Sequence, residues 1–460
     1  MLVSFSVSHF RSIGEEITLN MVASNQYSDH AAHVMTLPGV DRSVVRTAVI
    51  YGANGAGKSN LVKAIARAQD IILGRWFHLA KGEPHAFVAD AQTIPSSFEF
   101  RFVAADRIFA YGFDICGRSV RAEWLALVSK GDDIPLFDRD AEGHTTIHNV
   151  AVQKRFSNDP KLHDLLNSLA ATDLNDSQLF LNRASEVRES KLGLTIQAVI
   201  EWFTKTLVVV PIDRAPEHTF GRLCRDPALA AFAGALLNGV GTGIHKLEIV
   251  ERETLIPSGM WDSFDDVVRF SANNPDTTTL FSRDPQSPER CIARTLMACH
   301  ERDGAEYKLP MSEESDGSRR LLSLASLLTS GVPEPRVFVV DELDRSLHPT
   351  LCWRFLELFA GSVAAVRRQL IVTTHEAHLL DQELLRRDEY WFMEKDETQQ
   401  SRLVPLSVYR DVRKDLQLEK GYLSGRFGAV PFIGPADQFR QLLAPFTGEA
   451  AADATEAAPA

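Results

Sequence analysis

The chain has 460 residues, of which 45% are hydrophobic and 24% charged, and its 61 acidic and 49 basic side chains give a net charge of -12. This length is enough for two or three domains, and the acidic balance argues against a protein that coats nucleic acid through its overall field. The five cysteines form no CxxC pair, which is typical of a reducing compartment. No run of 18 apolar residues predicts a membrane span, and the first residues are too polar for a signal peptide. We therefore expect a cytoplasmic globular protein.

The first 149 residues have mainly strand patterns. Alternating apolar residues predict two antiparallel strands around a turn at Arg11–Gly14, and a continuous apolar strand follows at Thr47–Tyr51. A further alternating block, Ser96–Ile115, predicts a hairpin that turns near Ala105 and Asp106. We assign residues 1–149 to an N-terminal lobe with an antiparallel β subdomain.

The rest of the chain divides into three predicted parts. Residues 150–304 are expected to form a mainly helical insertion, with LHDLLNSLA, LTIQAVIEWFTKTL and ALAAFAGALLNGV as helices and Asn273–Arg290 as a loop. Residues 305–435 contain two apolar strands, VFVVD and LIVTTH, of the kind found in parallel sheets. The low-complexity tail, residues 436–460, is expected to be mostly disordered.

The sequence GANGAGKS, Gly52–Ser59, lies between the strand TAVIY and an amphipathic helix, and this is the context of a P-loop. Its glycines allow backbone N–H groups to surround phosphates, Lys58 reaches the terminal phosphates and Ser59 is a ligand for Mg²⁺. The alternative, a simple glycine-rich turn, does not explain the flanking strand and helix. We predict an ATP site whose contacts in this part of the chain are Asn54, Gly55, Gly57, Lys58, Ser59 and Asn60.

The strand RVFVV ends in two carboxylates, Asp341 and Glu342. An Asp at this position holds Mg²⁺ beside a P-loop, and the adjacent Glu orients or deprotonates the attacking water. A plain strand end is the alternative for this motif alone, but burying two acids without a cation is costly.

The second apolar strand, LIVTTH, ends in His375. A structural hydrogen-bonding role is the commoner one for such a histidine, but beside the acidic strand it becomes a candidate contact for the γ-phosphate. His378 lies too close in sequence to form a helix-borne zinc pair with His375, so we reject a zinc site.

The segment ESDGSRRLL, Glu314–Leu322, precedes the acidic strand by about one helix. With it, the chain resembles the ABC-type ATPases of the SMC, RecF and OLD-like branch. The P-loop has the GxxGxGKS form of that class, and five elements then follow in its order: signature loop, helix, strand ending in Asp-Glu, a D-loop-like LDRSLHP and a strand ending in His. Ser315 and Gly317 match the Ser and second Gly of the signature LSGGQ. Glu314, Asp316 and Ser318 depart from it.

The resemblance implies a composite site, in which Ser315 and Gly317 of one subunit cover the γ-phosphate held by another. Simple capping of a helix by Ser315 or Asp316 is compatible with this role. We expect Arg319 and Arg320 to serve the dimer face or a partner rather than DNA. The Q-loop position stays unassigned between Gln92 and Glu99, and His348-Pro349 after Leu347 departs from the usual D-loop.

At finer grain, FSVSHFRSIGEEITLNMVAS, ESDGSRRLLSL with DELDRSLHP, and LEKGYLSGRFGAVPFIG resemble the compact ABC-class family found beside effector genes in prokaryotic anti-phage loci. This implies an α/β ABC-type P-loop ATPase head with a central helical insertion, binding ATP and Mg²⁺ and turning over slowly. It also implies a homodimer or higher homo-oligomer joined through ATP, and adds Arg11 as a phosphate contact.

The function expected from this resemblance is a dimeric switch that controls a separate effector, most simply a nuclease. The alternative is a DNA-binding repair ATPase of the RecF or SMC kind; DNA binding stays open but unsupported, and no sustained heptads predict SMC arms. A metabolic P-loop kinase would not explain Ser315, Gly317 and His375 in this order.

Overall fold

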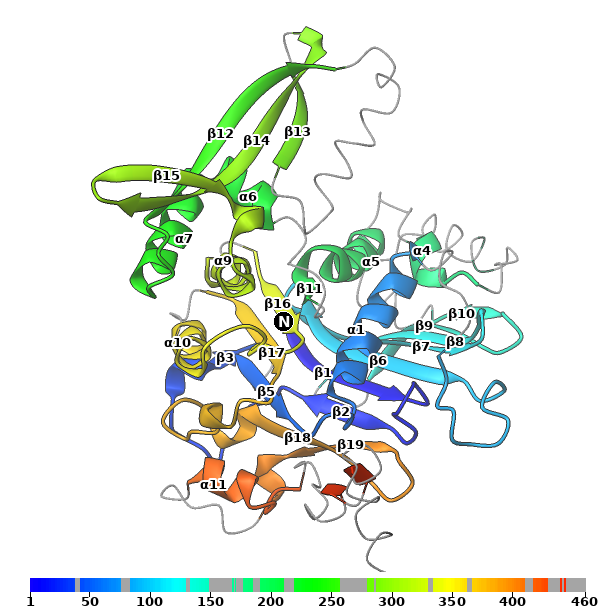
Figure 1. Cartoon of the computed structure of the whole chain (residues 1–460). Coiled ribbons are helices and arrows are strands. Elements are labelled where there is room, and N and C mark those ends of the chain that lie inside the picture. The colour runs from blue at the N-terminus through cyan, green and yellow to red at the C-terminus, as the bar shows by residue number, and fades with distance from the viewer. Residues whose placement is uncertain are drawn as a thin grey trace, which may run out of the picture.

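The computed structural model describes most of the chain. The described residues are 1–37, 42–75, 83–129, 133–148, 168, 170, 177–184, 191–210, 219–256, 279–284, 287–329, 334–361, 366–409, 417–428, 439–440 and 442–443. They form a head with two large sheets and an arm that projects from it (Figure 1).

A six-stranded sheet forms the centre of the head. Its order is β11-β16-β17-β5-β18-β19, in which all neighbours are parallel except β18 and β19. The strands are β11 (Leu207–Val210), β16 (Arg336–Val340), β17 (Arg368–Thr373), β5 (Thr47–Tyr51), β18 (Tyr390–Lys395) and β19 (Ser401–Pro405). Because parallel strands end at one edge, the loops after β5, β16 and β17 meet there.

The two faces of this sheet carry different helices. Ala48 and Ile50 of β5 belong to the same core cluster as the buried face of α1 (Lys58–Ile72), whereas Val49 and Tyr51 point to the other side. That other side is covered by α9 (Asp316–Leu328), α10 (Pro349–Ala360) and α11 (Leu418–Leu423). Since successive side chains of a strand point to opposite faces, α1 and α9 lie on opposite faces of the sheet.

A seven-stranded antiparallel sheet packs on the α1 side, in the order β10-β9-β8-β7-β6-β1-β2. Its strands are β1 (Leu2–Ser8), β2 (Ile17–Asn20), β6 (Ser96–Ala104), β7 (Arg107–Cys116), β8 (Ser119–Leu127), β9 (Ile134–Arg139) and β10 (Thr145–Ile147). A small hairpin, β3 (Val34–Thr36) and β4 (Ser43–Val45), comes between β2 and β5 in the chain. The predicted N-terminal strand pair is confirmed by the pairing of β1 with β2. The predicted hairpin turn is also confirmed, because β6 pairs with β7 and both turn residues, Ala105 and Asp106, have positive φ.

The prediction that residues 150–304 are mainly helical is wrong in part. The helices present are α4 (Phe180–Ala184), α5 (Lys191–Glu201), a π-helical turn (Trp202–Thr206), α6 (Thr219–Arg225) and α7 (Pro227–Gly239). However, β11 joins the central sheet. The strands β12 (Lys246–Leu255), β13 (Thr279–Asp284) and β14 (Ser287–Arg302) form an antiparallel sheet with β15 (Ala305–Pro310), and this sheet forms the arm (Figure 1). Within the described residues, α7 packs on one face of that sheet, against side chains that include Leu247, Leu296 and Ala298.

Three smaller predictions concern segments near the ends of these elements. The loop predicted over Asn273–Arg290 is contradicted from Thr279 onward, where β13 and β14 pair. Most of LHDLLNSLA and of the tail 436–460 lies outside the described residues. In the C-terminal segment, Tyr422 and Phe427 are buried and stack on Phe392, so both belong to the core.

Candidate functional site

The loop Gly52–Ser59 joins β5 to α1 at the carboxyl edge of the central sheet. Gly55 and Gly57 have φ angles of +80° and +110°, in the region that L-residues rarely adopt. A Cβ atom at Gly57 would in addition overlap the Ser401 hydroxyl. Backbone geometry therefore requires both glycines, as in a loop that turns its N–H groups inward.

The start of α1 is open to an anion. It carries no side-chain N-cap, whereas Asp226, Ser315 and His348 cap α7, α9 and α10. Uncapped N–H groups and the helix dipole favour phosphate at this end. Asn54 is exposed in the loop and Ser59 is half-buried in the first turn, so these residues fit a triphosphate with its Mg²⁺.

Lys58 is folded back over the loop. Its Nζ donates to the carbonyls of Gly52 at 2.6 Å and Ala53 at 3.2 Å, and lies 3.4 Å from Nδ1 of His375. Burial lowers the pKa of Lys58 to about 8, and nearby carboxylates led by Asp341 offset only part of this effect. The ammonium is thus held at the place where the phosphates of a P-loop ligand lie.

His375, directly after β17, is joined to the P-loop through Lys58. Burial, and then the Lys58 ammonium, lowers the pKa of His375, so the imidazole is neutral near pH 7. Because Nδ1 faces an ammonium it accepts, and the ring proton is assigned to Nε2. The Asp344 carboxylate accepts from the His375 backbone N–H at 3.3 Å and holds this turn in place.

Asp341 and Glu342 end β16 next to β17. Asp341 is 2% exposed and accepts from the Thr373 hydroxyl at 2.5 Å. The same hydroxyl accepts from the Glu342 N–H at 2.8 Å, and Glu342 has a φ of +48°, a strained conformation for a non-glycine residue. The turn thereby separates the two carboxylates, keeping Asp341 buried and Glu342 half-buried.

The signature segment begins α9 on the opposite face of the sheet from α1. The Ser315 hydroxyl caps this helix, accepting from the Ser318 N–H at 3.2 Å. A Cβ atom at Gly317 would lie 2.8 Å from the Ser346 carbonyl oxygen, so glycine lets the helix start pack on the D-loop. The structure therefore joins the signature segment to the D-loop of the same chain.

Arg320 contradicts the expectation that it serves the dimer face or a partner. Its Nη2 donates to the carbonyls of both Asp341 and Glu342 at 3.0 Å, and burial lowers its pKa. Arg320 therefore connects α9 to the acidic turn of its own chain. Arg319 pairs with Asp316 and remains 43% exposed at the side chain.

Arg11 lies beside α1 but is engaged by a carboxylate. Its guanidinium pairs with Glu83, which also pairs with Arg67 of α1 at 2.8 Å. The next residue, Ser12, accepts from the Asn60 side-chain amide at 2.7 Å. In this structure the Arg11 guanidinium uses Nη2 for its pair with Glu83.

Asn60 and the P-loop are also tied to β19. The Ser401 hydroxyl donates to the Ala56 carbonyl at 2.7 Å and lies 2.7 Å from the Ser12 hydroxyl. Through Ser12 and Ser401, Asn60 is thus connected to the backbone of the P-loop in this structure. Sequence reasoning missed three residues of this region: Thr373, Asp344 and Ser401. Thr373 lies two residues before His375, and Asp344 lies two residues after Glu342, so their closeness to the motifs was the available signal for these two.

The unassigned Q-loop candidates lie in the N-terminal sheet region. Glu99 accepts from Arg101 and from the Trp124 indole, both at 3.0 Å, and the Gln92 carbonyl is 2.8 Å from Cys116 Sγ. These contacts assign neither residue to the nucleotide.

Two further sequence features have structural explanations. In place of the usual D-loop ending, the His348 Nδ1 accepts from the Thr350 N–H at 3.3 Å, so His348-Pro349 begins α10. His378 pairs with Glu419 at 3.0 Å, whereas Nδ1 of His375 lies 3.4 Å from Nζ of Lys58.

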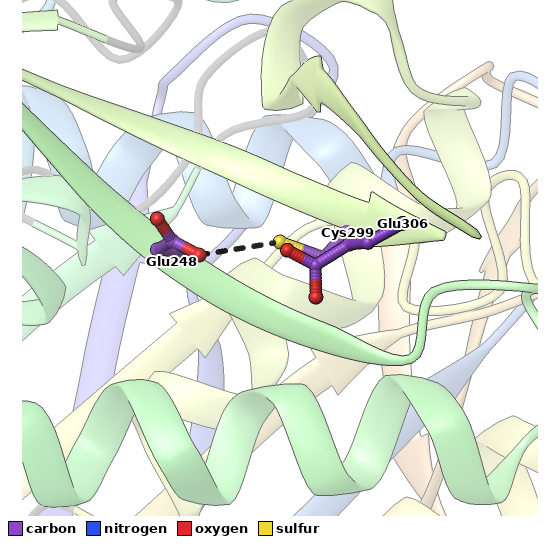
Figure 2. A group of neighbouring side chains, drawn as sticks. All are labelled: Glu248, Cys299 and Glu306. Carbon is purple, nitrogen blue, oxygen red and sulfur yellow. Dashed lines mark hydrogen bonds between the residues drawn. The ribbon is translucent and has the colours of Figure 1, made fainter. Parts of the chain in front are cut away.

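One group within the described part of the chain has a spacing suited to a metal, namely Glu248, Cys299 and Glu306 on the arm (Figure 2). Lys308 pairs with Glu248 at 2.7 Å and Lys246 with Glu306 at 2.8 Å. The ammonium groups of the two lysines therefore balance the charge of the two carboxylates without a metal ion.

Solved structures to which this chain is similar include SMC heads. "Crystal structure of the SmcHead bound to the C-winged helix domain of ScpA" is 13% identical, covers 88% of this chain and 97% of its own, and has a TM-score of 0.38. "SMC head domain from Thermotoga maritima" is 13% identical, with 88% and 98% covered and a TM-score of 0.34. A Pyrococcus furiosus Smc head with an extended coiled coil, bound to the C-terminal domain of ScpA, is 14% identical, with 93% and 98% covered and a TM-score of 0.37.

The sequence matches none of the curated proteins with which it was compared. In the part of the chain that the structure describes, no helix is both long and apolar enough to cross a membrane.

Residues 48–144 and 239–381, more than half of the chain, match the family described as "AAA domain, putative AbiEii toxin, Type IV TA system". The matched residues include the P-loop, the signature segment, the acidic turn and His375. This match and the P-loop fold support a nucleotide-binding ATPase. The chain belongs to the family "AAA domain, putative AbiEii toxin, Type IV TA system".

Proposed function

We propose that this protein is an ATP-driven dimeric switch that controls a separate effector protein in anti-phage defence. The observation that carries the switch is that α1 and α9 begin at the nucleotide edge but lie on opposite faces of one sheet. The P-loop and the signature segment of one chain therefore face different surroundings.

Within one chain, the P-loop edge supplies the groups for binding and hydrolysis. Lys58 and the N–H groups of α1 hold the triphosphate. Ser59 and Asp341 would hold Mg²⁺, which supplies charge neutralisation when bound. Glu342 accepts a proton from the attacking water or orients it, and the neutral His375 offers its Nε2–H to the γ-phosphate.

The covering groups come from a second copy. Ser315 and the N–H groups at the start of α9 would approach the γ-phosphate bound by the other P-loop. Arg320 connects that helix to the acidic turn of its own chain, and Gly317 lets it pack on the D-loop. Binding of ATP at one site would therefore change the geometry of the other site. ATP closes the pair, and hydrolysis opens it.

We assign the effector to a separate protein. The resemblance to compact ATPases encoded beside effector genes supports this assignment. A pull-down with the product of an adjacent gene, compared with and without ATP, tests it. Binding that is indifferent to ATP would contradict control by the switch.

The test of the composite site is Glu342→Gln. This change keeps the size of the side chain and removes the proton acceptor, so ATP should bind and hydrolysis should stop. Light scattering should then show one of two ATP-dependent changes: a rise from the mass of one chain, 51.1 kDa, to that of a pair, or, for a pair that is already assembled, a smaller hydrodynamic radius at constant mass. No change in the hydrodynamic radius or mass on addition of ATP would contradict the proposal. Lys58→Ala with Glu342→Gln is the control, since it should not respond to ATP.

A further inference from the structure

The arm sheet has an open edge at β15. In the described residues β15 pairs with β14, and Ala305–Leu309 is exposed throughout. The edge includes two large apolar side chains, Tyr307 at 56% and Leu309 at 41% exposure. An exposed strand edge with apolar side chains is a template for pairing with another strand.

The backbone register shows which groups this edge presents. A two-residue turn, Asp303-Gly304, joins β14 to β15, with φ of +52° and +75° and Arg302 opposite Ala305. Residues that flank such a turn exchange both hydrogen bonds, and the pattern then alternates. Ala305, Tyr307 and Leu309 therefore direct their backbone groups toward β14, whereas Glu306 and Lys308 direct theirs outward.

The side chains of these two outward residues have opposite charges and lie on one face of the sheet. Glu306 lies beside Cys299 and Glu248 (Figure 2), and Lys308 is opposite Cys299 in register. Their side chains remain 37% and 39% exposed despite their pairs within the arm. Tyr307 and Leu309 point to the other face.

We propose that β15 pairs antiparallel with β15 of a second copy, about a two-fold axis at Tyr307. In this register Glu306 lies opposite the second copy's Lys308 and exchanges both backbone hydrogen bonds with it. Tyr307 faces its own counterpart, and Leu309 faces the second copy's Ala305. Pro310 has no N–H and ends the ladder.

The charge pattern selects this register over its neighbours. The outward backbone groups also allow two-fold axes at Glu306 or at Lys308, but these would place two glutamates or two lysines opposite each other. The axis at Tyr307 pairs opposite charges and adds a contact between two aromatic rings. A self-complementary edge of this kind fits a second copy of the same chain.

This pairing requires no nucleotide. So short a strand buries less surface than the roughly 1,200 Å² of a stable interface, so the pair is expected to be reversible. In combination with the proposed closure of the heads, on which this role rests, it would keep two chains at a high effective concentration. ATP would then close a pair that is already assembled.

Cross-linking of Tyr307→Cys tests the pairing in the full chain. Across the axis the two substituted positions form a non-hydrogen-bonded pair with Cα atoms about 4.5 Å apart, within the range of a disulfide. Mild oxidation without nucleotide should give a covalent dimer on a non-reducing gel. Leu309→Cys is the matched control, because its two copies would lie about 14 Å apart along the paired strands. The unmodified protein controls for the five native cysteines.

A second change tests the hydrogen bonds. Glu306→Pro removes an outward N–H and leaves the bonds to β14 intact, and proline is tolerated on strand edges. In the Tyr307→Cys background it should lower the cross-linked fraction at least about tenfold, by loss of the pairing. Circular dichroism and ATP binding check that the variant is folded.

The inference is overturned if Tyr307→Cys gives no more dimer than Leu309→Cys, or if Glu306→Pro leaves the yield unchanged. It is also overturned if Glu306→Pro abolishes effector capture while Tyr307→Cys does not cross-link, since the edge would then serve the effector. Adding Lys58→Ala separates the two proposals, because cross-linking should persist in it. Cross-linking without any ATP-driven closure would sink only the proposed function.

Discussion

The two helices that begin at the nucleotide edge, α1 and α9, start in opposite ways. The N-cap residue of α1 is Gly57, in a left-handed conformation and without a side-chain hydrogen bond, whereas that of α9 is Ser315, whose hydroxyl caps the helix. The first helix is open to phosphate in its own chain, and the second is packed on its own D-loop through Gly317. In the proposed switch, the first helix start binds the nucleotide and the second covers it.

The largest effect should come from removing the charge at the binding helix. Lys58→Ala leaves the phosphates without the ammonium that now lies inside the loop. We expect ATP binding to be nearly lost and turnover to fall on the order of 10³-fold. Isothermal titration and a phosphate-release assay measure the two effects. Tight ATP binding by this variant would break the comparison, because α1 would not be the binding helix.

Ser315→Arg should have the next largest effect and should separate the two helices. A bulky cation at the start of α9 blocks the approach of a second subunit, so hydrolysis should fall on the order of 10²-fold. ATP affinity measured on dilute, monomeric protein should not change. Reduced affinity in the monomer would instead place the signature segment at its own P-loop. Since Ser315 caps α9, Ser315→Asn provides a control that keeps the cap.

The smallest effect is a pH dependence that sharpens the description of the binding helix. The pKa of Lys58 is lowered to about 8 by burial, and phosphate binds the ammonium form. Above pH 8 binding must take up a proton, so the Kd for ATP should rise by up to about tenfold per pH unit, whereas it should be flat with respect to Lys58 from pH 6 to 7.

Titrations in two buffers of different ionisation enthalpy would count the protons taken up with ATP. Lys58→Arg is the control and should remove this dependence, because arginine stays charged. An affinity that is constant from pH 7 to pH 9.5 would show that Lys58 keeps its ordinary pKa.

Local sequence patterns were sufficient where the chemistry is local. The P-loop, the acidic turn and His375 each follow an apolar strand, and these strands are adjacent in one sheet, so the predicted residues meet at one edge. The arm was missed because the helical pattern before it was extended too far. The period-two pattern in KLEIVERETL was readable, as was the β-branched run in LVVV.

The contacts between distant segments were not readable. Thr373 joins Asp341 to the next strand, Arg320 reaches the acidic turn from α9, and Glu83 holds Arg11. Each contact depends on a crossover or a packing angle that single-residue patterns do not encode. Arginine is usually a surface residue, but the Arg320 side chain lies against the backbone carbonyls of Asp341 and Glu342.

By itself the sequence determined the type of chemistry, because glycine spacing, Lys58 and the carboxylates at strand ends are properties of short segments. Only the tertiary structure decided that α1 and α9 lie on opposite faces of the sheet and that β15 is an open edge among the described residues. Both depend on strand order and on which faces find a partner, and burial of apolar surface over the whole chain settles these.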